Sequence, residues 1–392
     1  MAFASGPVSF QRFFMASAPA GQLTDAMERA LAEHAFGQLA PGVDDVQIGW
    51  VGPRHLMDAD LSADRICVGR FLLLALRIDR LRVPGSVLKS YVRQEEEDLL
   101  RDSGRDYLSK GERKRCREAA LERAEKERKS GSFRRMSAVP VLVDLSQATA
   151  YLGNTGAATS DKLMQLFRAT FSRVLEPADA ATIATKRMLA AKRSRALEHL
   201  APAHLVRPPD GYSERGELNT GDLSFLGREF LSWLWYHVDA DEGPLRVSAA
   251  DEVAVMIDKV VRLKCDYGLS GATVVSADGP THLPETKAAL RVGKQPTRMG
   301  LVLGGSAGEF RLTLDAARMT VSGLTLPEAP GERTARDRLE ERLAGVADVA
   351  NLLDALFEMF LLKRTDREWA AELRRMSAWA SAQKDAAARA AS

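Results

Sequence analysis

The stretch Ser109–Leu145, SKGERKRCREAALERAEKERKSGSFRRMSAVPVLVDL, joins the two patterns that decide the fold. Ser109 is followed three residues later by Glu112, the spacing of a capping box, which predicts that a helix begins here. The end of the stretch, Ala138–Leu145, is short, apolar and rich in valine, which predicts a β-strand. A helix that leads into a strand, with similar alternation on both sides, indicates an α+β fold with mixed or antiparallel sheets and flanking helices.

The predicted helix is strongly basic. From Ser109 to Arg135 the chain has eleven Lys and Arg against five Glu, a local net charge of +6, whereas the whole chain of 392 residues carries only +2. Such a concentration of charge is the electrostatic footprint of a polyanion binder. The same composition also fits a solvent-exposed helix held by i,i+4 ion pairs. The candidate DNA-binding residues in this segment are Lys110, Arg113, Lys114, Arg115, Arg117, Lys126, Lys129, Arg134 and Arg135.

The bulk composition is that of a folded protein outside the membrane. The chain is long enough for two or three domains, and 45% of its residues are hydrophobic. The apolar run Phe71–Leu76 is too short to span a bilayer, and the first residues lack the charged region of a signal peptide. Cys67, Cys116 and Cys265 are far apart and odd in number, which fits a reducing compartment. We therefore expect a cytoplasmic protein.

Upstream of the basic helix, strand and helix patterns alternate. Gly49–Pro53 is rich in turn residues, so we expect a turn there. The other elements predicted in this region are strands over Val8–Phe14 and Arg65–Arg80, a helix capped near Thr24 or Asp25, and a helix opened by Pro84.

Downstream, a helix capped by Ser160 or Asp161 closes the first part of the chain. Phe225–Val238 is a strongly apolar helix whose Trp and Tyr residues could stack on bases, although burial is the favoured interpretation. Met299–Leu324 predicts an antiparallel meander. Two helices, about Thr334–Leu362 and Thr365–Gln383, repeat apolar residues as a helical hairpin or a dimer face would. We divide the chain into domains over residues 1–177, 178–250, 251–330 and 331–392.

Catalytic chemistry has little support in the sequence. There is no nucleophile elbow and no phosphate-binding loop, and the six histidines have no zinc-site spacing. A nuclease would need clustered carboxylates to hold Mg²⁺. Asp144, Glu252, Asp258 and Asp278 are available, but their spacing does not mark a cluster. We expect no metal, no cofactor and no enzymatic activity.

Several segments, in order, resemble the recombination-associated protein RdgC family. They are Leu31–Phe36, Gly49–Pro53, Val83–Leu88, Ser132–Arg135 after the basic helix, and Arg291–Met299. The resemblance extends over about residues 8–175 and, less closely, 253–325. Lys294 lies in the last of these segments and joins the candidate DNA-binding residues.

This resemblance implies an α+β protein that forms a ring-shaped homodimer around duplex DNA, binds without sequence preference, and restrains RecA-type recombinase. It places Phe133 at the aromatic position of the family's dimer contact, and Lys110 and Arg113 near a basic position credited with DNA contact. The family's second basic cluster is replaced here by Ala277–Pro280. The family is often labelled an exonuclease, which the carboxylates do not support.

The main functional expectation is therefore a nucleoid-associated, double-stranded DNA-binding homodimer that modulates recombination or replication-fork repair. Nothing in the chain resembles a recognition helix or zinc finger that reads base edges. Two alternatives remain open: a DNA exonuclease, and a protein-interaction scaffold in which the charged helix is only a solvated surface.

Overall fold

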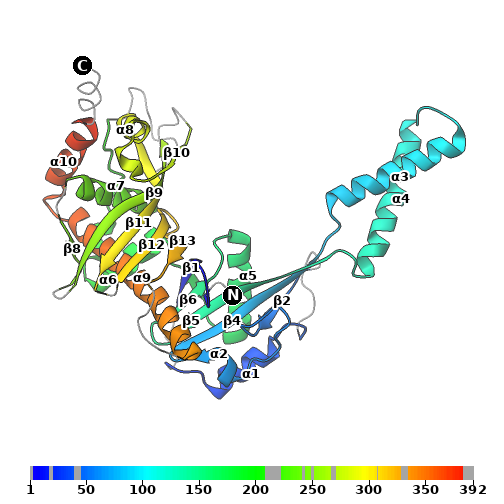
Figure 1. Cartoon of the computed structure of the whole chain (residues 1–392), viewed down its shortest axis with the longest axis horizontal. Coiled ribbons are helices and arrows are strands. Elements are labelled where there is room, and N and C mark those ends of the chain that lie inside the picture. The colour runs from blue at the N-terminus through cyan, green and yellow to red at the C-terminus, as the bar shows by residue number, and fades with distance from the viewer. Residues whose placement is uncertain are drawn as a thin grey trace.

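The chain forms an α+β fold of antiparallel strands with flanking helices, as the sequence predicted (Figure 1). The computed structural model describes residues 3–16, 21–38, 46–207, 222–240, 243–248, 251–265, 271–306, 308–327 and 334–382. The sequence predicts a loop over His199–Asp222 and a frayed end after Lys384; residues 208–221 and this end lie outside these ranges. Among the described helices, none is both long and apolar enough to cross a membrane.

The strands form a sheet of order β10-β9-β11-β12-β13-β1-β6-β5-β4-β2, and β3, β7 and β8 pair beside this path with β4, β1 and β9. Their bounds are β1 Val8–Met15, β2 Val46–Val51, β3 Cys67–Val68, β4 Phe71–Leu81, β5 Arg134–Asp144, β6 Thr149–Leu152, β7 Leu175–Pro177, β8 Leu245–Arg246, β9 Glu252–Cys265, β10 Thr273–Ala277, β11 Lys294–Gly305, β12 Gly308–Asp315 and β13 Val321–Thr325.

The helices flank this sheet. Their bounds are α1 Asp25–Glu33, α2 Ala63–Ile66, α3 Gly85–Ser103, α4 Lys110–Lys129, α5 Ala157–Phe171, α6 Ala180–Ala190, α7 Phe225–Asp239, α8 Pro284–Arg291, α9 Ala335–Arg364 and α10 Trp369–Ala382. The short 3₁₀ segments are η2 Ser194–Leu197 and η3 Pro280–His282.

Strand β1 joins the N-terminal and C-terminal parts of the sheet. Its first residues, Val8 and Phe10, pair with β13 near the end of the chain. Its later residues, Gln11–Phe14, pair with β6, and Phe13–Met15 pair with β7. The two parts therefore share one strand, whose two ends make ladder hydrogen bonds to different neighbours.

The turn expected at Gly49–Pro53 is wrong for its first three residues, which belong to strand β2. Gly49 lies there because an adjacent segment comes too close for a side chain: a Cβ would stand 2.5 Å from the Cα of Phe36. Next to it, Trp50 is buried and donates from Nε1 to the hydroxyl of Thr170 on α5 at 2.8 Å. Glycine marks a close approach of two backbone segments here, which a list of turn residues cannot distinguish from a turn.

Helix α5 begins at Ala157, earlier than the predicted cap at Ser160 or Asp161. Gly156 is the N-cap residue. Ser160 lies inside the helix and is buried, and its hydroxyl donates to Gln11 Oε1 at 2.7 Å. In the sequence, a serine that hydrogen-bonds a buried side chain on a neighbouring strand looks the same as a serine that caps a helix.

The aromatic helix α7 is buried, as favoured from its composition. Trp233 and Trp235 are 1% and 0% exposed and lie in the same core cluster as the apolar face of α9. Phe230 contacts Phe357 and Phe360 of α9 at ring-centroid distances of 5.2 and 5.8 Å. Stacking of these tryptophans on bases is therefore ruled out in this fold.

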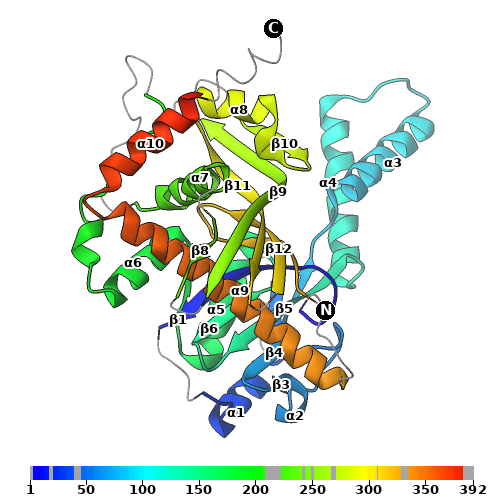
Figure 2. The same ribbon diagram turned by 60° about the vertical axis from the view of Figure 1, so that its left-hand side comes forward.

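The apolar repeat of α9 packs inside the chain, so its interpretation as a dimer face is wrong. The repeat residues Val346, Val349, Leu353 and Leu356 are at most 1% exposed. Helix α10 turns away from α9 and packs against α7 and α8 (Figures 1 and 2). A helix that packs in the core of its own chain thus has the same spacing of apolar residues as a helix that pairs with a second chain.

Strands β4 and β5 continue as a two-stranded ribbon and carry an arm made of α3 and α4, which projects away from the rest of the molecule (Figure 1). The burial of β5 changes along the ribbon: its last residues are buried, whereas Arg134 and Arg135 at its start are exposed. The molecule therefore has a U-like outline, with the arm on one side and the C-terminal strands on the other (Figure 1).

Candidate nucleic-acid interface

Helix α4, which carries most of the predicted basic residues, begins at a fully formed capping box. Ser109 Oγ accepts from the Glu112 N–H at 3.3 Å, and Glu112 Oε2 accepts from the Ser109 N–H at 2.9 Å. Arg105 also pairs with the Glu112 carboxylate. Hydrogen bonds from Arg105 and Ser109 lower the pKa of Glu112 to about 2, so this carboxylate is ionised at neutral pH.

The arm has a thin apolar core. Helix α4 buries only Cys116, Ala120 and Ala124, and α3 has no buried residue. Polar contacts supplement this packing: Tyr91 Oη donates to Glu127 Oε2 at 2.5 Å, and the Arg123 guanidinium lies 4.1 Å from the Tyr91 ring centroid. Small residues let the helices approach closely and leave the long cationic side chains free to extend into solvent.

All nine basic residues predicted in this segment are exposed. Lys114 lies 3.8 Å from Glu118, an exposed pair that contributes little to stability. In the described part of the chain, the other eight have no carboxylate within ion-pair distance: Lys110, Arg113, Arg115, Arg117, Lys126, Lys129, Arg134 and Arg135. Two glutamates of α4 pair with other arginines of the helix: Glu125 with Arg128, and Glu127 with Arg123.

The charge on α4 surrounds the helix and is densest in its first two turns. Lys110, Arg113, Lys114 and Arg117 are spaced i, i+3, i+4, i+7 and share one side, whereas Arg115 lies on another. Because α4 runs back toward β5, these two turns lie at the outer part of the arm (Figure 1). The interpretation as a solvated helix held by i,i+4 pairs therefore fits the C-terminal half of α4 better than its N-terminal half.

The ribbon adds one cation, Arg80, that the sequence did not single out. Arg135 on β5 is paired directly across the ladder with Arg80 on β4, and both side chains are exposed. Like charges directly opposite each other destabilise a strand pair, so this position is unfavourable for the ribbon alone. Arg80 could not be found from the sequence because its proximity to Arg135 depends on a strand pairing between distant segments. Phe133, the predicted dimer contact, is half-buried in the turn before β5.

Lys294 is separate from the arm and poorly placed for the role predicted for it. It begins β11, is only 8% exposed, and donates from Nζ to Thr273 Oγ1 at 2.7 Å. A buried ammonium that is already hydrogen-bonded has little surface to offer a phosphate. The nine arm and ribbon residues are thus exposed as a group, whereas Lys294 is buried apart from them.

Three of the four carboxylates considered for a nuclease, all except Asp258, pair with different basic residues. Asp144 is fully buried and pairs with Arg70 at 3.1 Å, and Glu252 pairs with Arg246 at 2.9 Å. Asp278 pairs with Lys259. Across the ranges that the structure describes, no three His, Cys, Asp or Glu side chains are grouped so that they could hold a metal ion.

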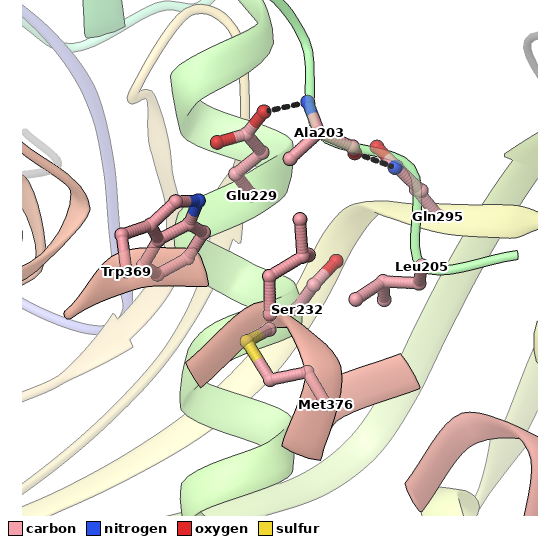
Figure 3. A pocket seen from close by; sticks show the side chains of 8 residues that line it. Ala203, Leu205, Glu229, Ser232, Gln295, Trp369 and Met376 are labelled. Carbon is pink, nitrogen blue, oxygen red and sulfur yellow. Dashed lines mark hydrogen bonds between the residues drawn. The ribbon is translucent and has the colours of Figure 1, made fainter. Parts of the chain in front are cut away.

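A cavity beside α7 is too small for a substrate (Figure 3). Its volume is about 10 Å³, room for roughly one water molecule. Glu229 at its wall accepts from the Ala203 N–H at 2.6 Å and pairs with Arg364 at 2.6 Å. Burial raises the pKa of Glu229 above its ordinary value, although Arg364 opposes this. These contacts hold the segment before α7 against α7 and the end of α9, and the cavity has no room for a nucleotide.

The comparisons with known proteins agree with the motifs of the N-terminal part. Residues 12–191 match the family described as "Putative exonuclease, RdgC". This span contains the ribbon and the arm, and it runs from within β1 to just past the end of α6. A search of curated proteins found no match. The weaker resemblance noted over residues 253–325 lies outside the matched span. Residues 12–191 are therefore similar to the RdgC family, the family that the sequence motifs resemble.

Proposed function

We propose that this protein binds double-stranded DNA through its arm and ribbon, without reading the base sequence. The observation that carries the proposal is the set of eight exposed Lys and Arg residues that lack a carboxylate partner in the described structure. The match to the RdgC family supports a role in recombination. Lys and Arg contacts to phosphates position a protein on a duplex but carry no sequence information.

The electrostatics give this proposal a measurable signature. Binding of Lys and Arg to phosphates releases condensed counterions, so affinity falls as salt rises. If about six of the exposed cations contact phosphates, log K falls against log salt with a slope of roughly −5. A protein that read bases through a few polar contacts would show a shallower slope together with a sequence preference.

We further propose that two copies of the chain form a homodimer that encloses the duplex. The U-like outline leaves an open side that a second copy would close, and the arm offers incompletely covered apolar surface. Leu121 on α4 is 46% exposed, and Phe133 lies half-buried at the junction of arm and ribbon. In this proposal the ring is nucleoid-associated and limits access of a RecA-type recombinase to DNA.

The deciding experiment reverses the charge in the first turns of α4. We expect the triple variant K114E/R115E/R117E to lose duplex binding at low salt in a gel-shift assay. The control is Arg101→Glu, since Arg101 on α3 is exposed and already paired with Asp98 at 3.0 Å. Unchanged binding of the triple variant would reject the proposal. Light scattering with and without duplex tests the dimer separately.

An exonuclease is the second candidate, because the description of the matching family names one. Such an enzyme would degrade end-labelled duplex in the presence of Mg²⁺ or Mn²⁺ and stop when EDTA is added. Intact DNA after prolonged incubation of pure protein would dismiss this candidate. A protein-interaction scaffold would need exposed apolar surfaces to bind partners. The aromatic face of α7 and the apolar face of α9, which would have served, are buried in the chain.

A further inference from the structure

The C-terminal part of the sheet has one covered face and one open face. Helix α7 packs on β9 and β11, and α6, α9 and α10 pack against α7 (Figure 2). The buried side chains of β9 that point to them include Val261 and Leu263. Residues of opposite parity, such as Arg262 and Lys264, are exposed on the other face.

Two arginines stand directly opposite each other on this open face. The pairing of β11 with β9 places Arg298 across from Arg262, and both side chains are exposed. Lys264 lies two residues along β9 on the same face and is also exposed. The apolar side chain of Val274 on β10, 60% exposed, completes the row beside Arg262.

These three cations have no carboxylate partner within ion-pair distance in the described residues. The carboxylate nearest in register is Asp315 on β12, opposite Arg298, and its Oδ1 accepts from the Arg318 N–H at 3.0 Å. By contrast, Arg311 on the same face is paired with Glu309 at 2.8 Å. Like charges directly opposite each other weaken a strand pair, so the Arg262–Arg298 pair costs stability when nothing lies between the two side chains.

We infer that Arg262 and Arg298, with Lys264 beside them, form a second binding site for the phosphate backbone of duplex DNA. Directly opposed side chains have Cβ atoms about 5 Å apart, so two planar guanidinium groups can close on one phosphate and share its oxygens. An anion there converts the repulsion into two charge-assisted contacts. The inference rests on the proposed function and adds to it that one duplex contacts both the arm and the C-terminal sheet.

The test measures binding of the full-length protein to a fluorescein-labelled duplex by anisotropy over a series of salt concentrations. For R262Q/R298Q we expect weaker binding, with the salt slope reduced by about 1 to 2, because each lost phosphate contact removes about 0.9. The same variant should have a higher melting temperature than the wild type without DNA, since the repulsion is gone. R311Q, which removes a cation that is already paired, should leave the slope unchanged.

A charge-preserving variant separates a phosphate site from a structural role. R262K/R298K should keep the salt slope near that of the wild type but bind less tightly, because lysine lacks the guanidinium fork. Wild-type affinity and slope in R262Q/R298Q would overturn the inference while leaving the arm proposal intact. Absence of salt-dependent binding in the wild type would overturn both. A variant that binds weakly but melts below the wild type would also contradict the inference, because the loss would then be structural.

Discussion

Arg12 and Asp354, near opposite ends of the chain, form a buried ion pair that holds β1 to α9. Arg12 Nη2 lies 2.6 Å from Asp354 Oδ1, and the side chains are 3% and 4% exposed. Arg187 on α6 contacts the other carboxylate oxygen at 3.0 Å. Burial alone would raise the pKa of Asp354, but attraction to Arg12 and Arg187 outweighs it and holds the pKa below its ordinary value.

Removing one partner of this pair should be costly. We expect Asp354→Asn to lower the free energy of unfolding by about 3–5 kcal/mol, because Arg12 is left as an uncompensated buried charge. Urea denaturation followed by circular dichroism measures the change. Replacing both partners, as in R12M/D354L, should cost less than D354N alone. Glu358→Gln is the control: its contact to Arg187 at 3.3 Å is partly exposed, and we expect a loss below about 1 kcal/mol.

Acid should destabilise the fold through carboxylates with lowered pKa. The hydrogen bonds from Arg54 lower the pKa of Asp58 to about 2, from 3.8. A carboxylate with a lowered pKa stabilises the fold above its unfolded pKa, and this contribution disappears as the pH falls toward the folded value. We therefore expect stability to decline between about pH 4 and pH 2. In Asp58→Asn this part of the decline should be absent. A wild-type stability that stays constant over that interval would contradict the assignment.

Two helical glycines should respond oppositely to alanine. At Gly227 in α7 a Cβ would stand 1.7 Å from the backbone oxygen of Ala316, so Gly227→Ala forces apart a tightly packed contact and should cost at least about 1–3 kcal/mol. At Gly111 in α4 the nearest atom would be Ser109 Oγ at 4.0 Å. Gly111→Ala should therefore leave global stability unchanged and slow hydrogen exchange in the arm, since alanine favours helix by up to about 1 kcal/mol. Equal responses at the two positions would refute the close approach.

DNA should not quench the protein's tryptophan fluorescence by stacking. Trp50, Trp233, Trp235 and Trp369 are each at most 8% exposed, and Trp379 is half-buried. We expect low accessibility to acrylamide and no change in emission when saturating duplex is added. Strong quenching that depends on Trp235, tested with Trp235→Phe, would mean that the aromatic helix is exposed to bases after all.

Local signals were sufficient for much of the fold. The capping box at Ser109 and Glu112, the burial of the aromatic helix and the antiparallel meander were all predictable, because each depends on residues close together in the chain. The misassigned Gly49 shows the limit. This position requires a glycine because the backbone of Phe36 lies too close for a side chain, and the sequence around Gly49 does not reveal that contact.

The candidate site divides in the same way. The cations of α4 could be listed from composition, because a solvent-exposed helix displays its charges wherever it lies. Two pairs of arginines could not be found in this way: Arg80 with Arg135, and Arg262 with Arg298. Their proximity depends on the strand register between distant segments. The burial of Lys294 could not be predicted either, because nothing in its neighbourhood along the chain signals its hydrogen bond to Thr273.

The sharing of β1 between the two parts of the sheet has a consequence for synthesis. Val8 pairs with Leu324, so β1 leaves the ribosome long before β13, one of its neighbours in the sheet, has been translated. Until then, one edge of that strand is open to pairing with another nascent chain. Fragments that end before β13 should therefore aggregate. Premature termination would release an aggregation-prone fragment and not a shorter functional protein.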